Sequence, residues 1–204
     1  MEVVTAREDV VLQKPEDIRF LVPIFHTARA CCGAATAYLL RRIAYRAGAY
    51  APGIQEFMFH ELNTSREGGS IENVQRWFNS HVSRLHELAY RLQCRRVAMP
   101  TKALIDWVTA GKGYRGAMLP TDFRTLHPDP GAAGDRRAEG AVAHAVGLTV
   151  DRLDPAGDEE LVMIDPWPGV KGGANDRCKV HADLELAHRA RNFHSLIYYW
   201  TGWS

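Results

Sequence analysis

The chain has few cysteines, no excess of charge of either sign and no long apolar run, and each absence excludes a class of protein. Four cysteines in 204 residues form neither a dense disulfide framework nor a paired zinc-ligand pattern. The 25 basic and 24 acidic side chains nearly cancel, so no global field attracts nucleic acid or an anionic membrane. No stretch approaches the roughly 18 apolar residues needed to span a bilayer.

The first residues, MEVVTAREDVVLQ, also lack the basic region and apolar run of a secretory signal. We therefore expect a cytoplasmic protein with free thiols, or one exported without a conventional signal peptide. A hydrophobic content of 46% suffices for one well-buried core, so a single domain over residues 1–204 is the simplest organisation. Within it, residues 1–23 are expected to form a lead-in segment. Residues 122–140, rich in Pro, Gly, Asp and Arg, are expected to form an exposed loop.

The first half of the chain carries helical periodicity. Apolar residues four apart predict a helix over residues 32–48, which begins at the cysteines and ends at a glycine. The pattern of residues 70–93 predicts a second helix, and TKALIDWVTAGKG predicts a short one capped by Thr101. The arginine pairs Arg41–Arg42 and Arg95–Arg96 are expected at solvated helix ends or in loops.

The second half is typical of strands. YRGAMLP, AVAHAVGLTVDRL, EELVMIDPW and FHSLIYYWTGW are short, apolar and bounded by turn residues, and DLELAHRA provides one or two helical turns before the last of them. Helices followed by a small antiparallel sheet predict an α+β fold rather than alternating α/β.

One pattern suggests a reactive thiol. Cys32 lies at the predicted helix start, where the helix dipole stabilises a thiolate, and Gly33 after it lets the backbone approach a substrate. Taken alone, this pattern is more typical of a buried structural cysteine, and Cys31 lies directly beside Cys32.

The rest of the chain supplies partners for that thiol. His144 lies in one predicted strand, and Asp165 stands at the end of the next one, 21 residues on. A carboxylate on a neighbouring strand can accept a hydrogen bond from the imidazole, fix its tautomer and stabilise the imidazolium. The order of cysteine, histidine and aspartate is that of a nucleophile, a base and an orienting group. Trp167, two residues beyond the aspartate, is a candidate to shield the site from water.

The segments CCGAATAYLL, HAVGLTV and VMIDPWPG resemble the papain-like cysteine peptidase superfamily, and are most similar to its bacterial branch of bacteriocin-leader peptidase domains. LIDWVTAGKGYRGAML resembles that family's helix, glycine turn and strand before the histidine. The resemblance implies a papain-like α+β fold and a Cys32–His144–Asp165 triad. It assigns the nucleophile to Cys32 because that cysteine directly precedes glycine. Many relatives carry an oxyanion-hole glutamine about six residues earlier, where this chain has His26, which can donate a hydrogen bond instead.

The resemblance leaves three functions open. A thiol hydrolase would cut a peptide or isopeptide bond through a thioacyl-enzyme. A glutamine deamidase, transglutaminase or acyltransferase, such as a delivered bacterial effector or toxin, would resolve the same intermediate differently. A catalytically silent domain would only bind peptides, and His26 in place of glutamine favours it. Each acts on a protein or peptide and needs no cofactor or metal, and each is compatible with any oligomeric state.

Overall fold

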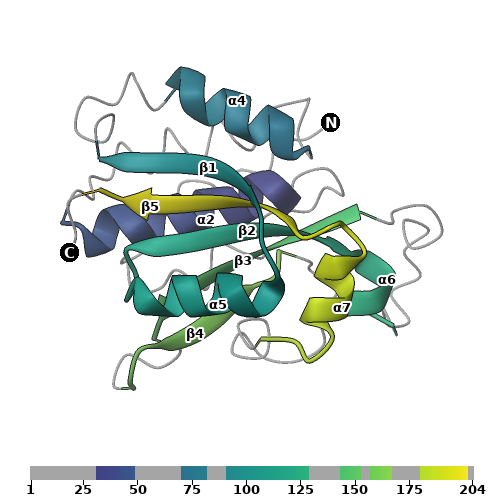
Figure 1. Ribbon diagram of the computed structural model, residues 1–204. Helices are drawn as coiled ribbons and strands as arrows, with labels where there is room; N and C mark the ends of the chain where they lie inside the picture. The colour runs from purple at the N-terminus through teal and green to yellow at the C-terminus, as the bar shows by residue number, and fades with distance from the viewer. Residues whose placement is uncertain are drawn as a thin grey trace, which may run out of the picture.

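The protein folds as α+β, with helices on both faces of one antiparallel sheet (Figure 1). The computed structural model describes residues 31–48, 70–81, 91–128, 143–152, 157–166 and 180–201. The helices are α2 (Cys31–Arg46), α4 (Ile71–His81), α5 (Thr101–Ala110), α6 (Phe123–Leu126) and α7 (Leu184–Arg189), and the strands are β1 (Leu92–Ala98), β2 (Arg115–Asp122), β3 (Ala143–Asp151), β4 (Glu160–Ile164) and β5 (His194–Trp200). Within these ranges, no helix combines the length and apolar character needed to cross a bilayer.

The strands follow the order β1-β5-β2-β3-β4, and every neighbouring pair is antiparallel. The predicted strands and the helix at the cysteines are confirmed. The helix predicted over residues 70–93 is wrong at its end, because Leu92 and Gln93 open strand β1. This strand lies at an edge of the sheet and is mostly partly or fully exposed, so its sequence lacks the apolar character that identified the other strands.

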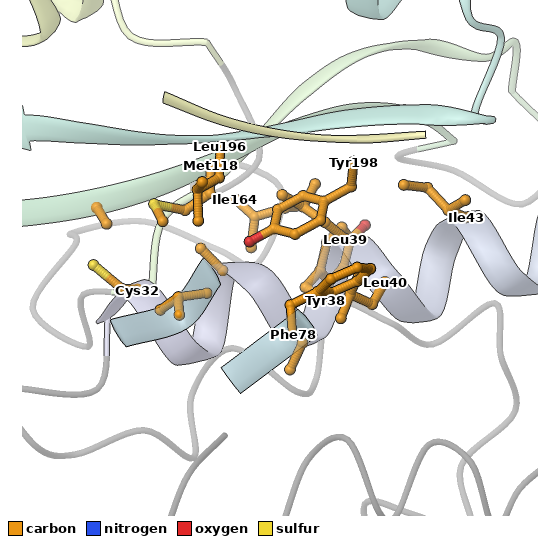
Figure 2. Packing of buried hydrophobic residues seen from close by; sticks show 14 of the residues in the cluster. Cys32, Tyr38, Leu39, Leu40, Ile43, Phe78, Met118, Ile164, Leu196 and Tyr198 are labelled. Atoms are coloured by element: carbon orange, nitrogen blue, oxygen red, sulfur yellow. The ribbon is translucent and has the colours of Figure 1, made fainter. Parts of the chain in front are cut away.

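The sheet separates two apolar clusters. Along β2, Met118 faces the helices α2 and α4, whereas its neighbours Ala117 and Leu119 face α5 and α7, as the two-residue period of a strand requires. Figure 2 shows the first cluster between α2 and the sheet, with Cys32 at one end of it and Phe78 of α4 close to Tyr198 of β5. Helix α2 therefore packs on this face of the sheet, and its first residue is Cys31.

Two glycines let α2 lie close to the sheet. Leu39 of the helix packs over Gly116 of β2 and Gly147 of β3. A Cβ atom on Gly116 would lie 2.9 Å from Leu39 Cδ2 and 3.3 Å from the Leu148 carbonyl oxygen. A Cβ atom on Gly147 would come no closer to Leu39 than 3.4 Å. The side chain missing at residue 116 thus sets how near the cysteine-bearing helix comes to the strands.

We expect Gly116→Val to lower the free energy of unfolding by about 1–3 kcal/mol, because added volume in a packed core forces neighbouring groups to move. Denaturant titration measures this loss. The matched variant Gly147→Val should cost less. Gly116→Val combined with Leu39→Ala should cost less than the sum of the single changes, since the clash with Leu39 is gone. Simple additivity would show that Leu39 does not fix this distance.

Two arginines of α2 are buried, against the expectation that they lie at a solvated helix end. Arg41 and Arg42 are 1% and 5% exposed. Arg42 lies 3.1 Å from Asp151 at the end of β3, and Arg46, one turn later, lies 2.8 Å from Glu159 just before β4. Removing one partner of such a buried pair typically costs about 3–5 kcal/mol. These ion pairs therefore join the helix to the β3–β4 hairpin.

A second polar cluster fixes α5 and α7 on the opposite face. Thr101 was predicted to cap α5, but the helix begins at that residue and its hydroxyl lies 3.0 Å from Nδ1 of His188 instead. The other ring nitrogen of His188 lies 3.0 Å from the Ser195 hydroxyl of β5. His188 is fully buried, and burial lowers its pKa to about 4, although the hydrogen bond to the His194 carbonyl opposes the shift.

This buried neutral histidine predicts acid sensitivity. The unfolded chain takes up a proton near pH ~6.5 and the folded one only near pH 4, so stability is present above pH ~6.5 and is lost as the pH falls. The loss should reach about 3 kcal/mol near pH 4, as 1.36 kcal/mol per unit implies. Unfolding of the unaltered protein and of His188→Gln should be compared between pH 7 and 4. The loss should shrink in His188→Gln and persist in His181→Gln, which alters a partly exposed histidine.

Candidate active site

Neighbouring strands bring His144 and Asp165 together. His144 is the second residue of β3, and Asp165 directly follows β4, whose last pair with β3 is Gly147–Ile164. This register makes the two side chains diagonal neighbours on one face, within reach of each other. His144 Nε2 lies 2.8 Å from Asp165 Oδ1, and the two residues are 6% and 2% exposed. The contact is the one that the sequence predicts; the catalytic roles stay a prediction.

The start of α2 supplies a thiol next to His144, but this thiol belongs to Cys31 and not to Cys32. Cys31, the first residue of α2, is the one that bonds to His144, and it is partly exposed. Cys32 is 3% exposed and belongs to the apolar cluster between α2 and the sheet. Because Asp165 occupies Nε2 of the ring, Nδ1 is the nitrogen left for the Cys31 sulfur. The geometry therefore favours Cys31 as the reactive thiol, where the sequence predicted Cys32.

The two neighbouring thiols titrate in opposite directions. The pKa of Cys31 lies well below the usual value, because the Cys32 thiol donates a hydrogen bond to its thiolate and the bond and positive charge of His144 add to this, outweighing burial. The pKa of Cys32 is raised by the same hydrogen bond, by burial and by the negative charge of Cys31. Cys31 also begins a helix, where free backbone N–H groups favour an anion.

The histidine and aspartate are tuned as an ion pair. Burial lowers the pKa of His144, but the charge and hydrogen bond of Asp165, with a further contribution from Cys31, outweigh it and raise the pKa to about 10. Burial raises the pKa of Asp165, yet His144 and His127 more than compensate and hold it far below its usual range. These shifts favour the charged form of each group in the contact: the thiolate of Cys31, the imidazolium of His144 and the carboxylate of Asp165.

The structure adds His127, which the sequence did not single out. Its Nε2 lies 2.9 Å from Asp165 Oδ2, so the carboxylate contacts a different histidine with each oxygen. The short helix α6 positions this residue: Asp122 caps the helix by accepting a hydrogen bond from the Thr125 amide, and the His127 amide donates to the Phe123 carbonyl. The ring of Phe123 packs against both histidines.

Residues 122–140 were predicted to be an exposed loop, which hid His127. Their first residues instead close β2 and form α6, with Phe123 and Leu126 buried. A usable signal was present, since Asp122 stands three residues before Thr125 and two apolar residues follow at helical spacing. Residues 129–140 lie outside the described residues.

Of the other predicted site residues, only Gly33 lies within the described part of the chain. Gly33 is buried in the first turn of α2, next to the two cysteines. His26, the oxyanion candidate, and Trp167, the proposed shield, lie outside the described residues, as do residues 1–23. Around the thiol, the described donor for a developing oxyanion is the backbone at the start of α2, where the first N–H groups make no bond within the helix.

The chain was also compared with known proteins. No family model, no curated protein and no solved structure matches it.

Proposed function

We propose that the protein is a papain-like thiol hydrolase that cleaves a peptide or isopeptide bond, with Cys31 as nucleophile, His144 as acid and base, and Asp165 as orienting group. One observation carries the proposal: the imidazole of His144 is shared between a thiol at a helix start and a buried carboxylate 2.8 Å from Nε2. Nucleophile, base and orienter in this contact are the elements of thiol-based acyl transfer.

The reaction follows from these positions. The Cys31 thiolate attacks the substrate carbonyl carbon, and the resulting oxyanion accepts hydrogen bonds from backbone N–H groups at the start of α2. The His144 imidazolium gives its proton to the leaving amine, which departs and leaves a thioester on Cys31. A water molecule then gives its proton to the neutral imidazole and attacks the thioester, releasing the acid and restoring the thiolate. Asp165 keeps the ring oriented throughout and stabilises its charged form.

The arrangement of elements supports the papain-like assignment. A central helix that begins at the nucleophile packs on an antiparallel sheet, whose strands carry the histidine and the aspartate in that order. The resemblance of CCGAATAYLL, HAVGLTV and VMIDPWPG adds to this, with one departure: the nucleophile would be the first cysteine of the pair, not the one that precedes glycine.

A thiol-directed electrophile tests the proposal. The protein is treated with a limiting amount of iodoacetamide at pH 6, and the modified residue is mapped by mass spectrometry. We expect Cys31 to react first, because its thiolate persists below the ~8.5 of a free cysteine. Cys94 should remain unmodified, since burial raises its pKa to about 12. His144→Ala should slow the labelling of Cys31 at pH 6; equal labelling of all cysteines, or no effect of His144→Ala, would contradict the proposal and favour a silent domain.

A further inference from the structure

The strongest unassigned feature is the group of ligand atoms around Asp165. His127, His144 and Asp165 each offer one ligand atom, an imidazole nitrogen or a carboxylate oxygen, and these three atoms lie within 4.8 Å of one another. They come from three elements, since α6 ends just before His127, β3 carries His144 and β4 precedes Asp165. We propose that these three residues form a binding site for a divalent transition-metal ion of the Zn²⁺ type. This departs from the sequence prediction of no metal, and it does not depend on the proposed hydrolase activity.

The chemistry of the donor set fits such an ion. Two imidazole nitrogens and one carboxylate oxygen are ligands that Zn²⁺ accepts, and sites with three protein ligands keep a fourth position open for water. Mg²⁺ and Ca²⁺ prefer oxygen ligands and more of them, so the two nitrogens disfavour those ions.

The distances also fit with a small adjustment. Zinc–ligand bonds of about 2.0–2.2 Å in a tetrahedron place neighbouring ligand atoms roughly 3.3–3.6 Å apart. The two nitrogen–oxygen contacts, at 2.8 and 2.9 Å, would need to open slightly, and all the ligand atoms already lie within 4.8 Å of one another. The His127 side chain is 11% exposed and that of Asp165 is 2% exposed, so the ion would enter past His127.

The hydroxyl of Thr121 could accept a hydrogen bond from, or donate one to, a water molecule at the fourth ligand position. Thr121 is the cross-strand partner of His144 and therefore lies on the same face of the sheet. Its hydroxyl is fully buried and, among the described residues, has no hydrogen-bond partner. A buried hydroxyl of this kind needs a partner, and water on a metal ion at this place would supply one.

The site would compete with the hydrogen bond that orients His144. An ion on Nε2 takes the position that the Asp165 oxygen now contacts, so metal occupancy and the orienting contact exclude each other. Cys31 does not belong to the group of ligand atoms, so its thiol is not a ligand in this arrangement. A metal ion bound by a cysteine thiol would therefore not be the proposed site, and the experiment must exclude it.

Metal titration of the full chain tests the proposal. Protein freed of metal with a chelator is titrated with Co²⁺, followed by visible absorption, and with Zn²⁺, followed by calorimetry. We expect one equivalent to bind, with the intense visible bands of tetrahedral cobalt and no sulfur-to-cobalt charge-transfer band in the near ultraviolet. Cys31→Ser should still bind one equivalent with the same cobalt spectrum, because the thiol is not a ligand. His127→Asn should bind at least about tenfold more weakly, since even groups that only support a ligand contribute 10–100-fold.

The matched control is His181→Asn, which alters a partly exposed histidine 3.8 Å from Asp183 and should leave the affinity unchanged. A sulfur charge-transfer band, loss of binding in Cys31→Ser, or undiminished binding in His127→Asn would each overturn the proposal. Absence of stoichiometric binding to the unaltered chain would do the same. Should His127→Asn not fold, the cobalt spectrum of the unaltered chain and the Cys31→Ser titration still decide. Failure of the iodoacetamide experiment would contradict the hydrolase but leave this result standing.

Discussion

Cys31→Ala is expected to abolish substrate turnover and labelling at residue 31, with a loss on the order of 10⁶ in turnover, as for the nucleophile of a related triad. Cys32→Ser should keep turnover within about tenfold of the unaltered protein. The reason is the contact of Cys31 with His144, together with the burial of Cys32 in the apolar cluster. Serine retains a hydroxyl that can donate a hydrogen bond to the Cys31 thiolate. The Cys32→Ser variant therefore removes the second thiol but keeps this hydrogen bond, and it tests only which cysteine is the nucleophile.

The comparison needs a check that both variants fold. Thermal unfolding should show at most a modest loss for Cys31→Ala, whose side chain is partly exposed, and a larger one for Cys32→Ser, which places a hydroxyl in a buried position. Loss of turnover in a folded Cys32→Ser variant, with Cys31→Ala still active, would return the nucleophile to the residue that the sequence resemblance favours.

Asp165→Ala is expected to lower turnover by about 10⁴-fold, less than the loss in Cys31→Ala, because nucleophile and base both remain. It should also change the pH profile of Cys31 alkylation. Asp165 is what raises the pKa of the buried His144, so without it burial lowers that pKa and the imidazolium is lost at neutral pH. The Cys31 thiolate loses its counter-charge, and its alkylation should shift to higher pH.

The alkylation profile is measured between pH 5 and 9 for the unaltered protein, Asp165→Ala and Asp165→Asn. Asparagine keeps an oxygen that can accept from the ring but not the charge, so its profile should lie between the other two. Asp183→Ala removes a half-exposed aspartate near another histidine and should have no effect. An unchanged profile in Asp165→Ala would remove the carboxylate from the proposed site, and damage equal to that of Cys31→Ala in a folded protein would show that it does more than orient.

The sequence predicts those helices and strands whose apolar residues follow a regular spacing or form a short run. The strands β2, β3 and β4 contain short, mostly apolar runs, and the diagonal contact of His144 with Asp165 follows from the pairing of two such strands that are consecutive in the chain. Edge strand β1 carries too little apolar pattern to identify. The cap and the two apolar residues of α6 were outweighed by the loop-like composition of residues 122–140, and His127 was missed with this helix.

The choice between neighbouring cysteines could not be read from the sequence for a geometric reason. Successive residues of a helix point about 100° apart, so the rotation of α2 decides which thiol meets His144. An amphipathic helix reveals its rotation through one apolar stripe, but α2 is buried on nearly every side, including Arg41 and Arg42. Its rotation is fixed by Leu39 over Gly116 and Gly147 and by the ion pairs of Arg42, which are tertiary contacts.

The position of β5 has a consequence for the order of events during synthesis. This strand is synthesised after all the other described strands and lies between β1 and β2. Strand β1 therefore cannot pair with the sheet until β5 has left the ribosome. Tyr198 of β5 also contacts Thr36 of the cysteine-bearing helix at 2.8 Å. A nascent chain therefore holds its cysteines for most of translation without the finished sheet that sets their chemistry. Chains terminated before residue 194 should carry thiols no more reactive than those of an unstructured peptide, so activation of Cys31 is tied to the synthesis of β5.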